Sequence, residues 1–418
     1  MSDYVSFVKG KFEHRDSIDE HSDLISHEVS QHGQSGLQED DLIPIEEESY
    51  SKKCLIVSAS IIFGSIFIFI IIVCCVTLIH PPKNTFSDIT CIRDQNDPWL
   101  EKGALSSVYD YNYNSAYFDL ADGSHAIAVR VQNQDSTQED SWDVLPSLIA
   151  LSTSSDNSIL KSWSRISSDS VIMTPDDATD SIGGCEDPRI LWVESEKLYF
   201  MFYTAVTYAD EAQTQLVPHL ALATSDDGRD WDYQGYLFPD EADSKSGALI
   251  VLDEPRDDGT VGLLLWGDSS IRVATTTDFY NYVNTGQVLI APRDGEWDGQ
   301  LVESGPPPFR LKDGNYLFFY NSAQQDGETI KPGYTLQYHV GYVILDGTTP
   351  ETVLKRSDSP LLSPDLDWES CNSSDDVTLT PRVVFTEGGY VIDENTINLV
   401  YQGCDVATNS MTCTIEWV

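Results

Sequence analysis

Residues 219–231 read HLALATSDDGRDW, a short apolar stretch followed by small hydroxylated residues, acidic residues and an aromatic side chain. The same order recurs in LIALSTSSDNSILKSW, which ends at Trp163, and in IRVATTTDFYNY, which ends at Tyr282. Asp and Ser side chains cap the main-chain amides of tight turns, and we expect the aromatic residue to pack back on its hairpin. These repeats predict a β-rich unit of about fifty residues that occurs several times along the chain.

The chain has the same texture from about Asp88 to its end. Short runs of β-branched and aromatic residues, such as KLYFMFYTAV, VGLLLWG and YLFFYNSA, are separated by Gly, Asn, Asp and Pro. This pattern is typical of an all-β protein, either a sandwich or a propeller, and the repeats favour the propeller. Four-stranded blades of about fifty residues fit about five times into this length. We therefore predict a five-bladed β-propeller over residues 104–418.

The charge balance restricts the partners of the protein. The chain has 68 acidic and 24 basic residues, a formal net charge of −44. Nucleic-acid binding needs clustered Lys and Arg, and so does an electrostatic attraction to anionic lipid headgroups. A neutral ligand such as an oligosaccharide is compatible with this acidic surface, whereas a nucleic-acid partner is not expected.

One segment predicts a membrane anchor. Leu55 to Ile79 is a run of 25 residues without a charge, and a bilayer core needs about 20 apolar residues in a helix. Lys52 and Lys53 precede this run, so the positive-inside bias places the N-terminus in the cytosol. We expect a single-pass type II membrane protein whose large domain is lumenal, in the Golgi or ER, or extracellular. The predicted parts before the propeller are a disordered acidic cytosolic tail, a transmembrane signal anchor and a stalk or linker, over residues 1–53, 54–79 and 80–103.

Cysteine usage agrees with an oxidising compartment, where some thiols pair. Cys404 and Cys413 flank a short loop and are candidates for a disulfide at a hairpin end. An odd number of cysteines beyond the membrane leaves one free or paired between chains. Asn372-Ser373-Ser374 is an N-glycosylation sequon. No Cys/His spacing typical of zinc occurs, and we expect neither a metal nor a cofactor. The five cysteines beyond the predicted span are Cys91, Cys185, Cys371, Cys404 and Cys413.

A second stretch raises a question of function. Residues 183–192 read GGCEDPRILW, in which Glu186 and Asp187 stand beside Arg189, just before an apolar run. Charged residues are rarely buried unless they are paired. Glu186 and Arg189 are therefore either a structural ion pair at a strand entrance or part of a functional site.

The order of several motifs resembles that of glycoside hydrolase family 130, five-bladed propellers that act on β-mannosides as phosphorylases or hydrolases. The resemblance extends from about Ala104 to Asp405 and implies the propeller fold independently of the repeats. The motifs are, in order, GGCEDPRI, FYTA, ALATSDDGRDW, VESGPPPFRLKDGNYLFFYNSA, YHVGYVILDGTTPETVLKRSDSPLLSP, Trp368-Glu369, VVF and YQGCD.

The resemblance implies roles for individual residues. Glycosidases usually use two carboxyl groups on opposite sides of the anomeric carbon. By its motif Asp187 is the catalytic acid, acting directly or through a sugar hydroxyl, while Glu186 and Arg189 bind sugar hydroxyls. Glu303 is the candidate general base that activates water; the alternative is a sugar-hydroxyl acceptor without base function.

Further substrate-binding candidates follow from the same motifs. Arg130, in HAIAVRV, matches an arginine that faces the channel in the family. Glu369 either lines the pocket or lies in a solvated loop. Asp405 either binds substrate or has a purely structural role. Tyr320 either contacts the sugar or packs in the core, as most aromatic residues in strands do. The remaining candidates are Asp268, Asn321 and Arg382.

The departures from the family decide between hydrolysis and phosphorolysis. Family phosphorylases have histidine where this chain has Tyr320-Asn321, a His-Arg pair near Gly267-Asp268, and a lysine near Leu301. Here cations are replaced and Glu303 is added, so a phosphate dianion is repelled. We predict an inverting, phosphate-independent β-mannoside hydrolase. The alternatives are a non-catalytic glycan-binding propeller, a β-mannoside phosphorylase, and a sialidase, which the acidic balance disfavours.

Overall fold

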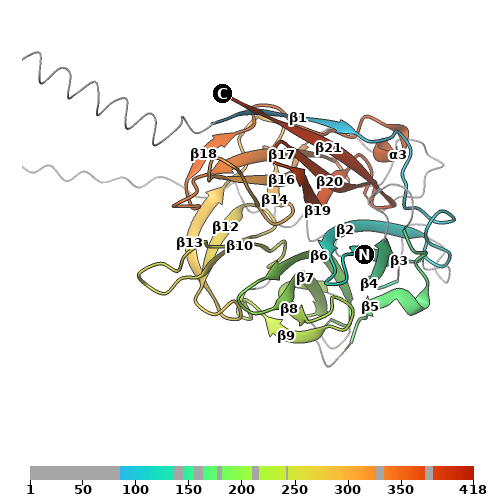
Figure 1. The fold of residues 1–418 in the computed structure, drawn as a ribbon. Helices are drawn as coiled ribbons and strands as arrows, with labels where there is room; N and C mark the ends of the chain where they lie inside the picture. The colour runs from blue at the N-terminus through green and yellow to red at the C-terminus, as the bar shows by residue number, and fades with distance from the viewer. Residues whose placement is uncertain are drawn as a thin grey trace, which may run out of the picture. The chain divides into compact units, whose positions relative to one another are not determined.

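The computed structural model describes most of the chain that follows the predicted linker (Figure 1). Among these residues no helix is both long enough and apolar enough to cross a bilayer. The predicted tail, the predicted span and the sequon at Asn372 lie outside the described residues. The described ranges are residues 85–134, 145–154, 163–176, 181–209, 216–241, 243–325, 334–371 and 380–418.

Five antiparallel sheets follow one another along the chain around a common centre, which confirms the all-β five-bladed propeller (Figure 1). The first blade consists of β2 (Tyr111–Asp119), β3 (His125–Gln132), β4 (Leu148–Ser154) and β5 (Val171–Met173). The second consists of β6 (Gly184–Val193), β7 (Leu198–Tyr208), β8 (Leu216–Ser225) and β9 (Asp232–Tyr236). The third consists of β10 (Ala248–Val251), β11 (Gly262–Trp266), β12 (Ile271–Thr276) and β13 (Tyr282–Ile290).

The last two blades depart from this simple order. The fourth contains β14 (Leu301–Ser304), β16 (Tyr316–Gln325), β17 (Leu336–Leu345) and β18 (Val353–Arg356), with β15 (Phe309–Arg310) paired to β16. The fifth contains β19 (Val384–Asp393), β20 (Thr396–Gly403), β21 (Ala407–Trp417) and, as its outer strand, β1 (Phe86–Arg93). Two short helical turns, η1 (Ser168–Ser170) and α3 (Asp367–Ser370), lie in connections.

Strand β1 corrects the predicted boundary of the propeller. It lies within residues 80–103, which we expected to be a stalk or linker, but it pairs with β21 along its length. An unpaired β21 would expose a row of main-chain donors and acceptors. The N-terminal strand therefore completes the fifth blade and joins the two ends of the domain.

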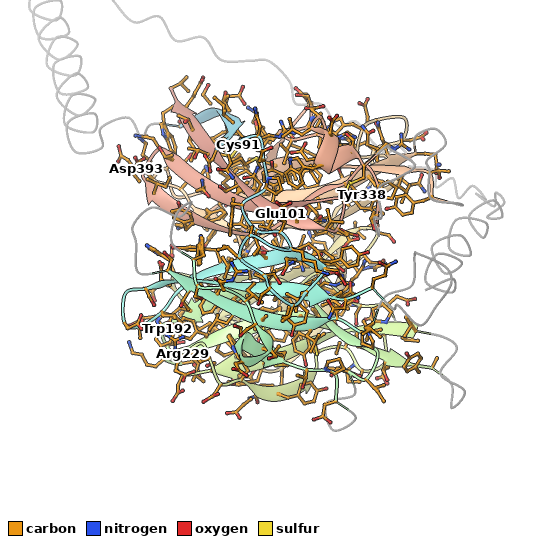
Figure 2. All side chains as sticks on the ribbon, turned by 90° about the vertical axis from the view of Figure 1, so that its right-hand side faces the viewer. Cys91, Glu101, Trp192, Arg229, Tyr338 and Asp393 are labelled. Atoms are coloured by element: carbon orange, nitrogen blue, oxygen red, sulfur yellow. A yellow bond between two sulfur atoms is a disulfide. The ribbon has the colours of Figure 1, made fainter. Side chains whose placement is uncertain are left out.

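The disulfides differ from the prediction. Cys413 pairs with Cys91, which Figure 2 shows on the outer strand of the fifth blade, and Cys371 pairs with Cys404. The predicted Cys404–Cys413 bridge is wrong because β21 runs away from the turn that follows Cys404, which carries Cys413 beside Cys91. Among the described cysteines Cys185 is free, and burial raises the pKa of its thiol to about 12.

The core consists of apolar layers between neighbouring blades. A middle strand such as β7, LYFMFYTAVTY, has nearly all of its residues buried because its blade packs on both neighbours. This is why the strands read as continuous apolar runs instead of alternating patterns. Each of the five interfaces between blades has such a layer. In order round the ring, starting between the first and second blades, one buried pair from each layer is Phe118 with Tyr199, Phe202 with Leu264, Leu265 with Phe318, Phe319 with Tyr401, and Ile127 with Val400.

In the second and third blades the sequence repeat lies at the same place, the hairpin between the third and fourth strands. Asp227 accepts hydrogen bonds from the main-chain amides of residues 229 and 230, at 2.7 and 2.9 Å. Asp278 caps the equivalent turn of the next blade. Trp231 packs against a buried cluster that includes Ala221 and Ala223 of its own hairpin, and also edge-on against Phe118 of the preceding blade. The repeated aromatic thus joins blades to one another.

Candidate active site

The centre of the propeller is lined by the first strand of each blade, β2, β6, β10, β14 and β19. Three of these strands contain a β-bulge at which the register shifts, and Asn114, Asp187 and Glu387 lie in these bulges. Asn114 and Asp187 have left-handed φ angles of 47° and 54°. Such angles are unfavourable outside glycine and concentrate at functional sites. The bulges therefore mark the part of the channel where side chains are aimed inward.

The bulge in β6 answers the question that GGCEDPRILW raises. In a regular strand Glu186 and Asp187 would point to opposite faces, but the bulge breaks this alternation. Both carboxylates contact the guanidinium of Arg130, with Nη2 at 2.5 Å from Glu186 Oε1 and Nη1 at 2.8 Å from Asp187 Oδ1. Ser147 donates to the same Glu186 oxygen at 3.0 Å. The partner of Glu186 is thus Arg130, and the alternative of a Glu186–Arg189 ion pair is wrong.

Arg189 has a different role from the predicted one. Its side chain has no exposed surface, and it donates to the main-chain carbonyls of Asp187, Ser304 and Gly305 at 3.0, 2.7 and 3.0 Å. Its Nη2 also lies 3.3 Å from Glu387 Oε1. The prediction that Arg189 binds sugar hydroxyls is therefore wrong, because its donors are used within the protein. One guanidinium instead joins the main chain at Asp187 to the main chain next to Glu303.

The GPPP motif begins with glycine for a steric reason. A Cβ atom at Gly305 would lie 2.5 Å from the carbonyl oxygen of Phe319, and the Gly305 amide donates to that same oxygen at 3.1 Å. Glycine lets β14 approach β16 closely, which fixes the place of Glu303 at the end of β14.

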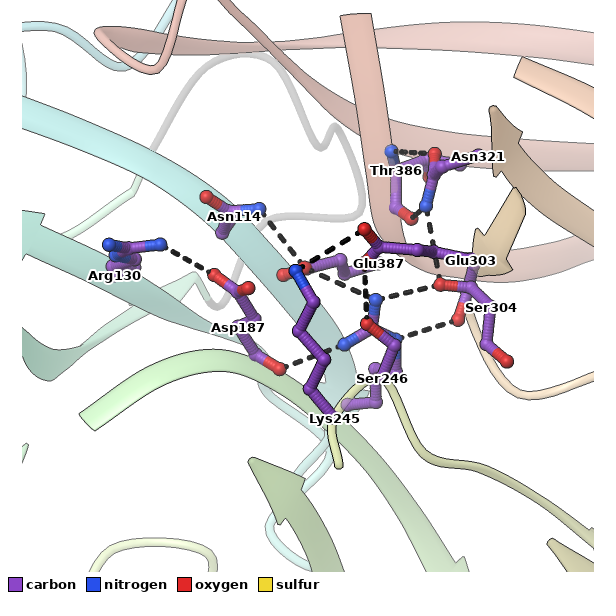
Figure 3. A network of polar contacts seen from close by, with 12 residues as sticks. Asn114, Arg130, Asp187, Lys245, Ser246, Glu303, Ser304, Asn321, Thr386 and Glu387 are labelled. Atoms are coloured by element: carbon purple, nitrogen blue, oxygen red, sulfur yellow. Dashed lines mark hydrogen bonds and ion pairs between the residues drawn. The ribbon is translucent and has the colours of Figure 1, made fainter. Parts of the chain in front are cut away.

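Glu303 is buried and held by two donors from the segment before β10. Ser246 Oγ donates to Oε2 at 2.8 Å, and Lys245 Nζ lies 3.3 Å from Oε1. Burial raises the pKa of Glu303, Lys245 opposes this, and the negative charges of Asp268 and Asp187 raise it further. Figure 3 shows Asp187 and Glu303 in one polar network at the centre of the propeller. The structure therefore brings the two predicted catalytic carboxylates together.

Besides Ser304 and Thr386, which join this network through their main chain, the labelled residues that were not predicted from the sequence are Asn114, Lys245, Ser246 and Glu387 (Figure 3). Their signal is position, because each lies in or just before the first strand of a blade, as Asp187 does. Lys245 and Ser246 precede the apolar run ALIV much as Glu186 and Asp187 precede ILWV. An alignment of the blade starts would have found them.

Glu369 lies outside the network, so its prediction as a pocket residue is wrong. It is fully buried and accepts two hydrogen bonds of 2.7 Å from Arg93 and one of 2.8 Å from Tyr401. The amides of residues 365 and 366 also donate to it. Glu369 therefore attaches β1 and helix α3 to the fifth blade.

Tyr320 and Asn321 are also structural, because neither has exposed surface. The Tyr320 hydroxyl donates to Asp298 at 2.7 Å and accepts from Arg356 at 3.1 Å. Asn321 donates to the carbonyl of Thr386 at 2.9 Å and accepts from its amide at 2.8 Å. Their prediction as substrate contacts is wrong, since they stabilise the fourth blade and its junction with the fifth.

Asp268, Arg382 and Asp405 are partly exposed and keep their place as candidates for substrate binding. The charge of Asp268 raises the pKa of Glu303, and that of Asp405 raises the pKa of Arg130, so both act on the network. Arg382 has a left-handed φ of 55° and precedes β19. No group of His, Cys, Asp and Glu residues suited to hold a metal ion occurs among the described residues.

A separate cavity of about 340 Å³ lies further along the same strands. Its wall includes Tyr117 of β2, Ile190 and Trp192 of β6, Val251 of β10 and Gly389 of β19. Tyr117, Ile190, Trp192 and Gly389 follow the network residues of their own strands, and Val251 ends β10, the strand that follows Lys245 and Ser246. The cavity is thus distinct from the carboxylate network and mostly apolar.

A five-bladed propeller with several carboxylates at its centre is compatible with a carbohydrate-active enzyme, because cleavage of a glycosidic bond uses carboxyl groups. The family model described as β-1,4-mannooligosaccharide phosphorylase matches residues 136–418. The chain therefore belongs to glycoside hydrolase family 130, as the motif order indicates.

Individual relatives carry related descriptions. The chain is 30% identical over 231 residues to a 1,2-β-oligomannan phosphorylase of Thermoanaerobacter sp. (strain X514), covering 53% of this chain and 65% of that protein. It is 27% identical over 229 residues to a β-1,2-mannobiose phosphorylase of the same organism, covering 53% and 63%. The matches thus span less than two thirds of these curated relatives.

A solved structure extends the likeness over a larger part of the chain. Its description states that the GH130 family of mannoside phosphorylases contains glycoside hydrolases that target β-1,2-mannosidic linkages in Candida mannan. It is 26% identical to this chain with a TM-score of 0.61, covering 78% of this chain and 94% of that one.

Proposed function

We propose that the protein is an inverting, phosphate-independent hydrolase of β-mannosides. The observation that supports this is the pairing of the cations in the network. Arg130 binds Glu186 and Asp187, Arg189 lies against Glu387, and Lys245 binds Glu303. An attacking phosphate dianion needs cationic donors to hold its charge. Here those cations are already bonded to carboxylates, which would repel phosphate.

In the proposed reaction Asp187 donates a proton to the leaving glycosidic oxygen, directly or through a sugar hydroxyl. The bond between the anomeric carbon and that oxygen breaks. A water molecule forms the new bond to the anomeric carbon from the opposite face, and Glu303 takes a proton from this water. The configuration at the anomeric carbon inverts. Exchange with solvent then returns the proton to Asp187 and removes it from Glu303.

Phosphorolysis is the second candidate. The sequence predicts that cations have been replaced, yet Lys245 and Arg130 are both present in the network. If Lys245 were released from Glu303 it would offer a cation to phosphate. The phosphorylase descriptions of the two curated relatives also favour this candidate.

The test uses the full-length chain with β-1,2- and β-1,4-mannobiose, with and without phosphate, and NMR to identify the products. We expect α-mannose to appear first, at a rate that does not depend on phosphate. Asp187→Asn and Glu303→Gln should each lower kcat by about 10²–10⁴-fold, as loss of a general acid or base does. Asp122→Asn, on an exposed turn, is the control. Mannose 1-phosphate would support the second candidate, and binding without turnover would contradict both.

We also propose that the propeller lies on the lumenal or extracellular side of a membrane, anchored by residues 54–79. The two disulfides support an oxidising compartment. Protease protection of intact vesicles, with deglycosylation at Asn372, tests this. A propeller that is digested from the cytosolic side would contradict it.

A further inference from the structure

The Cys371–Cys404 disulfide lies beside an unusual turn at the end of β20. Cys404 and Asp405 have left-handed φ angles of 54° and 53°, and such angles outside glycine persist only where the surrounding structure enforces them. The Gln402 side chain accepts a hydrogen bond from the Asp405 amide at 3.0 Å and donates one to the Asp405 carboxylate at 2.8 Å. These hydrogen bonds shape the turn, and the disulfide attaches it to Cys371, the C-cap residue of helix α3.

Helix α3 is a firm anchor for this bridge. Its Glu369 has no exposed surface and accepts hydrogen bonds from Arg93 and Tyr401. Its Trp368 packs so closely on β20 that a Cβ atom at Gly403 would lie 2.4 Å from the indole ring. The disulfide therefore attaches the turn to a part of the fifth blade that buried contacts already hold in place.

The turn that follows Cys404 contacts the first blade. The main-chain carbonyl of Val406 accepts a hydrogen bond from the Asn112 amide of β2 at 3.1 Å. The side chain of Val406 packs against the buried rings of Tyr111 and Tyr113 in the same strand. The turn thus forms part of the junction at which the fifth blade meets the first and the ring closes.

Tyr113 connects this junction to the carboxylate network. The guanidinium carbon of Arg130 lies 4.8 Å from the centre of the Tyr113 ring, which is a cation–π contact. The same guanidinium holds Glu186 and Asp187 at 2.5 and 2.8 Å. A continuous series of packed groups, of the kind that can carry coupling between distant positions, therefore joins the disulfide to Asp187 through Val406, Tyr113 and Arg130.

We propose that Cys371 and Cys404 are positioning residues of the candidate active site. Their disulfide keeps Val406 against Tyr113 and so fixes the guanidinium that orients Asp187. This inference rests on the proposed role of Asp187 as the acid. It makes turnover, and not only stability, depend on an oxidising compartment in which disulfides form. A displacement of about 1 Å at a reacting group can cost about 10²-fold in rate, so removal of the bridge should lower kcat by about tenfold or more.

The first measurement compares two double variants of the full-length chain. Cys371→Ser with Cys404→Ser removes the bridge at the turn. Cys91→Ser with Cys413→Ser is the matched control, because it removes the bridge between the two outer strands of the fifth blade. The bridge removed in the control joins residues 322 positions apart, against 33 for the bridge at the turn. Since a longer closed loop gives a larger stabilisation, the control should lose at least as much stability.

We expect only the first variant to lose kcat on β-mannobiose, by about tenfold or more, when the rate is expressed per folded molecule and the folded fraction is measured by circular dichroism. The control should keep the wild-type kcat. A purely structural role would lower kcat in both variants or in neither, and either result would overturn the proposal.

Val406→Ala is a second test that keeps both disulfides and decides the matter if the first variant does not fold. It removes most of the packing on Tyr113, so kcat should fall in the same direction by a smaller factor. A wild-type kcat in Val406→Ala would overturn the proposal, because the series of contacts passes through this side chain.

The second measurement does not need activity. The Asn112 amide is protected by its hydrogen bond to Val406, and local loosening is seen as faster amide hydrogen exchange. The peptide that contains Asn112 should exchange faster in the Cys371→Ser, Cys404→Ser variant than in the wild-type chain and in the control. Unchanged exchange would overturn the inference about the disulfide. Faster exchange in a chain whose wild-type form cleaves no mannoside would overturn only the proposed function.

Discussion

Arg189→Lys tests the idea that one guanidinium holds together the strands that carry Asp187 and Glu303. Lysine keeps the positive charge but lacks the planar fork of donors. Arg189 donates to three main-chain carbonyls at 2.7–3.0 Å and faces Glu387 at 3.3 Å, with no exposed surface. A single ammonium at this depth cannot reach all four acceptors. At least two buried acceptors should lose their donor.

The magnitude follows from these contacts. Each buried acceptor that loses its donor costs about 1–3 kcal/mol, and breaking a buried ion pair costs about 3–5 kcal/mol. We therefore expect Arg189→Lys to lower the free energy of unfolding by about 3–5 kcal/mol. This is a large part of the roughly 5–15 kcal/mol that is typical of folded proteins. The rate should fall as well, because the separation of Asp187 and Glu303 depends on the same contacts.

The assay is urea denaturation of the full-length chain, followed by tryptophan fluorescence. Arg229→Lys is the matched control, because Arg229 is half-exposed and its contact with Asp122 is 3.5 Å long. Exposed pairs of this kind contribute about 0–1 kcal/mol. If Arg189→Lys shifts the midpoint no more than Arg229→Lys, the reasoning about the buried carbonyls is refuted.

Two further predictions concern the base and the ring closure. Lys245→Met should move the acid limb of the pH profile of kcat/KM to higher pH. Lys245 opposes the rise that burial causes in the pKa of Glu303, and Glu303 must be ionised to act as a base. An unchanged acid limb would contradict this prediction. Replacing Cys91 and Cys413 together by Ser should lower stability by about 2–4 kcal/mol, measured as a lower Tm, because the bridge joins residues 322 positions apart and holds β1 in place. An unchanged Tm would show that strand pairing alone closes the ring.

The sequence predicted the architecture well because blades are local structures. An apolar run, an acidic turn and a following aromatic residue recur in three stretches of the sequence, and Asp227 and Asp278 cap two of these turns. These features are visible without the fold. The additional contact of Trp231 with Phe118 of the preceding blade was not predicted, because the two residues are distant in the chain. Asp187 was proposed as the acid from a local motif, and Glu303 as the base because it departs from the family pattern.

The errors concern residues whose partners are distant in the chain. Tyr320, Asn321 and Glu369 lie within the family motifs, but neighbours along the chain do not show whether a side chain faces the channel or another blade. Strand β1 has little to distinguish it from a linker until it pairs with β21. Each error reflects a contact that forms only when the ring closes.

The sequence alone determined the ring of β blades, the family and a carboxylate at the start of the second blade. Strand, turn and motif signals each extend over only a few residues, so they can be recognised without the tertiary structure. Which charges meet at the centre depends on the closed ring. Asn114 and Glu387 are 273 positions apart yet bond directly, and Arg189 reaches across to the main chain of the fourth blade. The propeller brings the five first strands around one axis, and burial there pairs the charges and raises the pKa of Glu303 and Glu387.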